Sequence, residues 1–330
     1  FLYRGDMAAE WVAYGPQAEQ TCKQFVAGIN AFIDLTRRDA SRLPPEFTLM
    51  QTKPSPWAAE DVVRIRSHGL TRNALSEVLR ANVLAQADPV TDALRQLLEP
   101  HTQAEPVPDI DLNSVPLEIL TLFKLACATV TFEAARLTAT PAEAWHWTKV
   151  NDLGEVVLDQ AMTGSNNWVI APEKSATGRP IMANDPHRAH SLPGLRYLVH
   201  LTAPGLDVIG GGEPVIPGIS IGHNGTAAFG LTIFYSDQED VYVYDTSPDN
   251  PDLYRYDNGW EPVEIVEHEF VVRGYDTQTL PLRFTRHGPV LHEDAQKNRL
   301  YAVRSVWFEA GTAPYMRSLA SMRSTDLKHY

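Results

Sequence analysis

The chain has 330 residues, a net charge of −13 and no cluster of Lys and Arg, so it lacks the electrostatic footprint of a nucleic-acid-binding protein. Its 44% of hydrophobic and 21% of charged residues are typical of a globular protein with a sizeable core. No apolar run approaches the ~18 residues that would span a bilayer, so we expect neither a membrane span nor a nucleic-acid partner.

The first half of the chain predicts helices. Phe25 and Ile29 recur at helical spacing within an amphipathic stretch. Ser55 followed by Pro56 has the form of an N-cap and a first helical position, and residues 88–89 repeat this signal. The expected helices cover residues 16–39, 56–86, 88–98 and 116–137, with a loop over 101–113 and a connector over 138–164.

The second half predicts short strands separated by turns. Alternating and β-branched residues between Gly, Pro and Asn clusters favour strands there, whereas Gly210-Gly211-Gly212 is interpreted as a flexible turn. The expected strands cover residues 168–170, 180–183, 197–201, 219–221, 227–234, 241–244, 267–272, 280–284 and 301–307. A helical first half followed by a strand-rich second half predicts an α+β fold.

A Gly-Ser bond lies where this change occurs. In Gly164-Ser165-Asn166-Asn167, cleavage before Ser165 would give that residue a free α-amine beside its hydroxyl. With a pKa near ~7.7–8.0, the amine can act as the base that a weak serine nucleophile requires. The same hydroxyl can attack the Gly164 carbonyl, because glycine tolerates a close approach. Taken alone, the tetrapeptide is more typical of a polar loop that enters a strand.

Five segments together carry a family resemblance. They are residues 54–63, 165–172, 181–187, 218–225 and 286–290, and they occur in an order and spacing similar to the penicillin amidase (penicillin acylase) family. This family belongs to the N-terminal nucleophile hydrolases. The resemblance covers nearly all of the chain, although each segment is short.

The resemblance implies a four-layer αββα fold, in which two stacked antiparallel sheets lie between helical layers. It divides the chain into an α-subunit-like helical region (1–137), a connector or spacer that ends at the self-cleavage bond (138–164), and the N-terminal part of the β-subunit (165–330). The two-sheet core would be incomplete at the C-terminus. The implied partners are the two chains of an α/β heterodimer made from one precursor.

The resemblance also assigns roles to individual residues. Ser165 would be the nucleophile of an acyl-enzyme mechanism, and its α-amine the base. His187 would hydrogen-bond this active end, although its position after a proline also fits an ordinary loop histidine. The backbone N–H of Ile233 would be an oxyanion donor, a role worth ~2.7–4 kcal/mol of transition-state stabilisation. Supporting contacts are expected from Asn167, His223 and Asn224.

Four acidic residues are metal candidates. Asp237, Glu239 and Asp240 lie close together in sequence and offer the oxygen ligands that Ca²⁺ prefers. The resemblance implies a structural calcium ion here, with Glu77 contributed by the first half. The alternative is an acidic turn and a solvated helix glutamate. No organic cofactor is expected.

Some features depart from the penicillin G branch of the family. Asn73 and Arg188 stand where that branch has aromatic residues, which weakens the case for a phenylacetyl substrate. The family hydrolyses small-molecule N-acyl amides, including penicillins, cephalosporins, acyl-homoserine lactones and acylated peptides. Its second oxyanion donor is expected beyond residue 330, so the chain resembles the central part of a larger enzyme. Family members imply a periplasmic or secreted location.

Other interpretations remain open. The chain can be a non-catalytic relative or an inactive fragment that keeps the fold with Gly164–Ser165 uncut. Residues 218–222 match G-x-S-x-G, but an α/β-hydrolase elbow needs a strand before the serine and a helix after it, which this context does not predict. Cys22 and Cys127 lack metal-ligand spacing and are expected to be buried thiols.

Overall fold

The computed structural model describes residues 4–66, 73–96, 111–127, 143, 164–187, 194–232, 237–272, 274–313, 316 and 322–323. The chain divides into two compact units. The first unit holds Arg72–Leu158 and Ser236–Val306, and the second holds Leu2–Thr71, Asp159–Tyr235 and Trp307–Tyr330. Both units therefore contain residues from before and after Gly164.

The described residues of the first unit form the helices α5 (Ala74–Gln86), α6 (Pro89–Gln96) and α7 (Leu120–Cys127), with 3-10 turns η2 (Leu112–Ser114) and η3 (Leu117–Ile119) before α7. The predicted cap of α6 is confirmed, because the Thr91 backbone N–H donates to Asp88 Oδ1 at 2.8 Å. The expected helix over 116–137 is described only as η3 and α7, since residues 128–137 lie outside the described part.

The sheet of the first unit is antiparallel and has the strand order β10-β11-β12-β13-β7-β8-β9. Its strands are β7 (Glu239–Ser247), β8 (Asn250–Tyr256), β9 (Gly259–Pro262), β10 (Glu264–Phe270), β11 (Gln278–Thr285), β12 (Gly288–Asp294) and β13 (Arg299–Ser305). The sequence did not predict β8, β9 or β12, whose turn-rich surroundings obscure the strand pattern.

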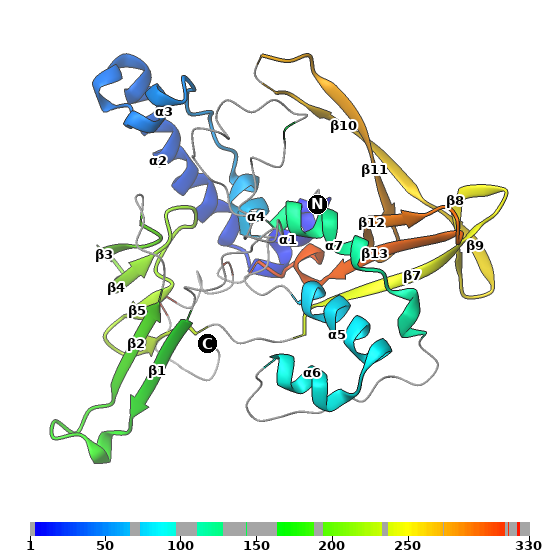
Figure 1. Ribbon diagram of the computed structural model, residues 1–330. Helices are drawn as coiled ribbons and strands as arrows, with labels where there is room; N and C mark the ends of the chain where they lie inside the picture. Colours follow the sequence, from blue (N-terminus) through cyan, green and yellow to red (C-terminus); the bar gives the residue numbers. More distant parts are fainter. Residues whose placement is uncertain are drawn as a thin grey trace. The chain divides into compact units, whose positions relative to one another are not determined.

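The central strand β13 is buried on both faces. Tyr301 and Val303 pack with the helices, and Leu300 and Ala302 pack toward β7 and β8, as the alternation of side chains along a strand requires. Helix α5 packs on β7 and α7 on β12 (Figure 1). The Tyr301 hydroxyl also donates to the Ser114 carbonyl at 2.9 Å, which fixes the segment before α7.

The helices of the second unit are α1 (Met7–Tyr14), α2 (Ala18–Arg38), α3 (Pro45–Leu49) and α4 (Ala59–Arg66), with the 3-10 turn η1 (Ala40–Arg42) after α2. The prediction for 16–39 is confirmed. The helix expected from Pro56 to residue 86 is wrong: α4 begins at Ala59 and ends at Arg66, and α5 begins at Ala74. The Asn30 side chain pairs with both the N–H and the C=O of Trp57, which holds the segment before α4 out of a helix.

A buried acid joins the ends of the second unit. Glu10 on α1 is 1% exposed and accepts hydrogen bonds from the Tyr14 hydroxyl and, at 2.8 Å, from the Gly311 N–H. The Tyr14 oxygen in turn accepts from the Ala313 N–H at 3.0 Å. These contacts bring the segment after β13 onto the core formed by α1, α2 and α4.

Within its described residues, the second unit has two antiparallel sheets, β1-β2 and β3-β4-β5-β6. Their strands are β1 (Gly164–Ile170), β2 (Ile181–His187), β3 (Tyr197–Ala203), β4 (Leu206–Gly212), β5 (Ile221–His223) and β6 (Ala228–Phe229), and η5 (Pro172–Lys174) lies between β1 and β2. The interpretation of Gly210-Gly211-Gly212 as a flexible turn is wrong, because these residues end β4. A Cβ on Gly210 would lie 2.0 Å from the Ile221 carbonyl oxygen, so glycine permits the close pairing of β4 and β5.

Helices and antiparallel sheets in both units confirm the α+β class. The four-layer stacking and the boundaries 1–137, 138–164 and 165–330 stay predictions. Within the described part, none of the helices has both the length and the apolar character to cross a membrane.

Candidate active site

Ser165 is the second residue of a hairpin strand. Strand β1 pairs antiparallel with β2, with Gly164 opposite His187 and Ser165 opposite Pro186. The apolar run that begins at Trp168 favours a strand and carries the pairing toward the turn. The Gly164–Ser165 bond therefore lies at the open end of the hairpin, beside the last residue of β2.

The pairing register separates the two faces of this hairpin. Because side chains alternate along a strand, those of Ser165 and Asn167 share a face with those of Pro186 and Asn184. His187 belongs to the other face, with Gly164. In the uncut chain, the predicted nucleophile and the predicted supporting histidine thus point to opposite faces.

A carboxylate orients the His187 ring. His187 Nε2 lies 2.9 Å from Asp185 Oδ2, and both side chains are more than half exposed. Asp185 is two residues before His187 on the same strand, so both point the same way. The sequence motifs indicated His187 as a candidate site residue but did not indicate Asp185. Whether His187 hydrogen-bonds the free amine of a cut chain stays a prediction.

Asn184 connects the hairpin to a second segment. Its Nδ2 donates to the carbonyls of Asn166, at 3.2 Å, and of Leu231, at 3.1 Å. Its Oδ1 accepts from the Leu231 N–H at 3.0 Å. Leu231 makes these contacts in place of strand pairing. The strand expected over 227–234 is therefore wrong in extent, because the structure describes only Ala228–Phe229 (β6) as a strand. Ile233 lies outside the described residues.

The remaining predicted supporting residues lie in the same unit. Asn224 Oδ1 accepts from the N–H groups of Thr226 and Ala227 at 3.0 and 2.8 Å, and its Nδ2 donates to the Met322 carbonyl at 3.2 Å. His223 Nδ1 accepts from the Gly225 N–H at 3.3 Å. Both side chains therefore shape a turn. Asn167 is exposed and stands opposite Asn184.

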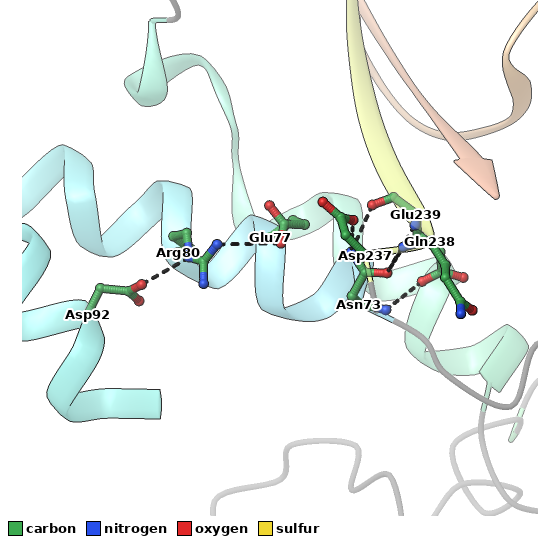
Figure 2. A network of polar contacts seen from close by, with 7 residues as sticks. All are labelled: Asn73, Glu77, Arg80, Asp92, Asp237, Gln238 and Glu239. Atoms are coloured by element: carbon green, nitrogen blue, oxygen red, sulfur yellow. Dashed lines mark hydrogen bonds and ion pairs between the residues drawn. The ribbon is translucent and has the colours of Figure 1, made fainter. Parts of the chain in front are cut away.

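The predicted metal acids lie in the first unit, where β7 begins beside the N-terminus of α5 (Figure 2). Glu239 is 6% exposed, and its Oε2 accepts from the backbone N–H groups of Asn73 and Ala74 at 2.9 and 3.0 Å. A carboxylate at this position satisfies helix N–H groups and interacts favourably with the helix dipole. Glu239 thus acts as the cap of α5.

Asn73 forms the other half of this junction. Its Oδ1 accepts from the N–H groups of Gln238 and Glu239, both at 2.9 Å. Its Nδ2 donates to Asp237 Oδ1 at 2.7 Å and to the Glu239 carbonyl at 3.0 Å. From the sequence, Asn73 was interpreted only as a departure from the penicillin G branch, which has an aromatic residue at this position. Its partners lie more than 160 positions away, and no local pattern reveals them.

Glu77 lies one turn further along α5. Burial raises its pKa, the Asp237 and Asp240 carboxylates raise it further, and Arg80 opposes them. Figure 2 shows Arg80 between Glu77 and Asp92, with Arg80 nitrogens 3.9 Å from Glu77 Oε1 and 3.0 Å from Asp92 Oδ2. Arg80 therefore links Glu77 on α5 to Asp92 on α6 through two ion pairs.

These acids are not assembled as a metal-ligand set. Among the residues that the structure describes, no three His, Cys, Asp or Glu side chains converge to hold a metal ion. The Glu239 carboxylate is engaged by helix N–H groups, and Asp237 by Asn73. Calcium binding by Glu77, Asp237, Glu239 and Asp240 stays a prediction.

The family is established by comparison with known proteins. The penicillin amidase family model matches residues 1–330, so the chain belongs to the penicillin amidase family. The resemblance inferred from the sequence is thereby confirmed.

Two relatives match most of this chain at low sequence identity. Penicillin acylase 2 proenzyme from a Pseudomonas strain is 30% identical over 303 residues, which make up 91% of this chain and 36% of that protein. Acyl-homoserine lactone acylase QuiP from Pseudomonas aeruginosa is 27% identical over 281 residues, 84% of this chain and 30% of that protein. The chain therefore spans about a third of the length of these relatives.

A solved structure, that of a thermostable penicillin G acylase from Alcaligenes faecalis, is also similar to this chain. The match covers 49% of this chain and 29% of the acylase chain, with 24% sequence identity and a TM-score of 0.44.

Proposed function

We propose that this chain carries the self-processing centre of an N-acyl amide hydrolase, with Ser165 as its nucleophile. The observation that carries the proposal is the position of Gly164–Ser165 at the open end of the β1–β2 hairpin, in a chain of the penicillin amidase family. Cleavage there leaves Ser165 as the first residue of a strand that the pairing with β2 still holds. Relatives named as acylases, one of them a proenzyme, support the same function.

The proposed chemistry is acyl transfer in two stages. The Ser165 hydroxyl attacks the substrate carbonyl while its proton moves to the α-amine of the same residue. The C–N bond then breaks, the leaving amine takes up that proton, and an acyl ester remains on Ser165. Water, deprotonated by the α-amine, attacks the ester carbonyl; the Ser165 oxygen then leaves, takes back that proton from the amine, and the acid is released. The Ile233 N–H is the proposed donor to the oxyanion in both stages.

The substrate class follows from this chemistry and from the relatives. We assign a small-molecule N-acyl amide, with penicillins and acyl-homoserine lactones as the first compounds to test. The products of processing would be an α chain and a β chain that remain associated. We also assign a periplasmic or secreted location, since the relatives are bacterial acylases of this family.

The direct test is Ser165→Ala in the full-length protein. Because the hydroxyl is the attacking group, this variant should remain one uncut chain and should not release amine from any N-acyl substrate. Ser55→Ala, at an exposed serine in an extended segment, is the matched control and should be processed normally. Normal processing of Ser165→Ala would refute the assignment of the nucleophile, and an uncut, inactive wild type would favour a non-catalytic relative.

We propose separately that Ca²⁺ binds near Glu77. The support is the grouping of acids at this junction: Asp237 and Asp240 lie near enough to Glu77 to interact with it electrostatically, and carboxylate oxygens are the ligands that Ca²⁺ prefers. Calorimetric titration with CaCl₂ should detect binding in the wild type and weaker binding in Glu77→Gln. Glu173→Gln, at an exposed glutamate of the second unit, should bind as the wild type does. Absence of heat and of thermal stabilisation in the wild type would refute the site.

A further inference from the structure

The side chain of Asn184 uses three hydrogen bonds to join two segments that are far apart in sequence. It holds both backbone groups of Leu231, the N–H through Oδ1 at 3.0 Å and the carbonyl through Nδ2 at 3.1 Å. Its remaining Nδ2 hydrogen reaches the carbonyl of Asn166 at 3.2 Å. An amide that pairs with both groups of one residue fixes its orientation as a neighbouring strand would.

Gly230 makes this contact possible from the other side. A Cβ at residue 230 would lie 2.9 Å from Asn184 Oδ1 and 3.0 Å from both Asn184 Cβ and Cγ. The first distance is shorter than real Cβ atoms show and the other two are tighter than most contacts, so a larger residue would displace the Asn184 side chain or the segment by a few tenths of an ångström. The close approach therefore depends on the amide at residue 184 and on the glycine at residue 230.

The contact lies on the face of the hairpin that carries the predicted nucleophile. Asn184 stands opposite Asn167 and Ser165 opposite Pro186, so the side chains of Asn184 and Ser165 point to the same face. The third bond of Asn184 goes to the residue directly after Ser165. Leu231 precedes Ile233 by two residues in the sequence.

We propose that Asn184 is a positioning residue for acyl transfer, which holds segment 230–232 against the Ser165 face of strand β1. This inference rests on the proposed function, in which the Ile233 N–H stabilises the oxyanion formed at Ser165. Asn184 itself touches no reacting atom. It fixes Leu231, two residues before the proposed donor in the sequence, beside the strand that carries Ser165. A displacement of about 1 Å at such a site can lower the rate ~10²-fold.

Two substitutions at residue 184 separate the parts of the contact. Asn184→Ala removes all three bonds. Asn184→Asp keeps the size and the acceptor for the Leu231 N–H, but it loses both donations and places a negative charge against two carbonyl oxygens. Gly230→Ala breaks the same contact from the opposite segment. Asn258→Ala and Asn258→Asp, at an exposed asparagine in the β8–β9 turn, are the matched controls.

The kinetic experiment uses the full-length protein and N-acyl-4-nitroanilines of increasing acyl length. In Asn184→Ala, Asn184→Asp and Gly230→Ala we expect chains that still begin at Ser165, with kcat lowered ~10²-fold and KM changed less than about threefold, because transition-state alignment is lost while the acyl site remains. Both Asn258 variants should retain the wild-type kcat. A processed Asn184→Ala enzyme with kcat within twofold of the wild type would overturn the proposal.

A second measurement tests the contact without any turnover. Hydrogen exchange followed by mass spectrometry should show faster exchange of the Leu231 amide in Asn184→Ala than in the wild type, since its acceptor is gone. Unchanged exchange would overturn the claim that Asn184 holds this segment. If the wild type neither cleaves nor turns over substrate, the proposed function fails, and the exchange result still decides the contact.

Discussion

Glu239 is predicted to stabilise the first unit by capping α5, and the size of this effect follows from its contacts. Its carboxylate is almost fully buried and accepts two backbone N–H groups. Leaving a buried donor without a partner costs about 1–3 kcal/mol, so Glu239→Ala should lower the free energy of unfolding by about 4 kcal/mol. Glu239→Gln keeps an acceptor but loses the charge, which should cost about 2 kcal/mol from weaker hydrogen bonds and a lost helix-dipole interaction.

Urea unfolding measures both losses. The variants are made in the Ser165→Ala background, so that every protein is a single chain, and EDTA is present to exclude effects of calcium. Glu269, an exposed residue of β10, provides the control: its Ala and Gln variants should stay within about 0.5 kcal/mol of the parent. A loss below about 0.5 kcal/mol for Glu239→Ala, at an unchanged slope with urea, would refute the capping role.

Three further predictions concern other parts of the fold. His287 Nδ1 and the Tyr244 hydroxyl share a hydrogen bond, and burial, with Arg286 and Arg304 nearby, lowers the pKa of His287. Stability should therefore be full above the ordinary histidine pKa of about 6.5 and fall as the pH drops below it, and a pH-independent difference between wild type and His287→Gln would contradict this. Burial raises the pKa of Cys22 to about 12, so its peptide should react with iodoacetamide only after denaturation, and rapid labelling of the folded protein would be the contrary result. Gly210→Ala should separate β4 from β5 and lower the melting temperature, and a melting temperature equal to that of the wild type would count against the close pairing.

Local patterns were sufficient for some elements and insufficient for others. Helix α2 and the cap of α6 follow from spacing and capping residues within one short window, and both are confirmed. Strand β4 was not predicted because its glycines resemble a turn. They are required because the backbone of β5 leaves no room for a Cβ at Gly210. The helix expected from Pro56 was wrong because Asn30, on another helix, holds the backbone of Trp57.

The same limit applies to the candidate site. The motifs located Ser165 and His187, and the family they indicated is confirmed. They did not reveal Asn184 or Asn73, because the function of each amide depends on backbone groups far away in sequence. Glu239 was noticed for its charge and interpreted as a metal ligand, which stays a prediction. Its contacts add the role of a helix cap, which depends on N–H groups far away in the sequence.

Ser165 is proposed to become the first residue of a mature chain. N-terminal sequencing of the purified full-length protein, together with its intact mass, tests this directly. We expect two chains, of which the second begins Ser-Asn-Asn-Trp, as residues 165–168 require. A single intact species under all conditions, or a second chain that begins at any other residue, would contradict it.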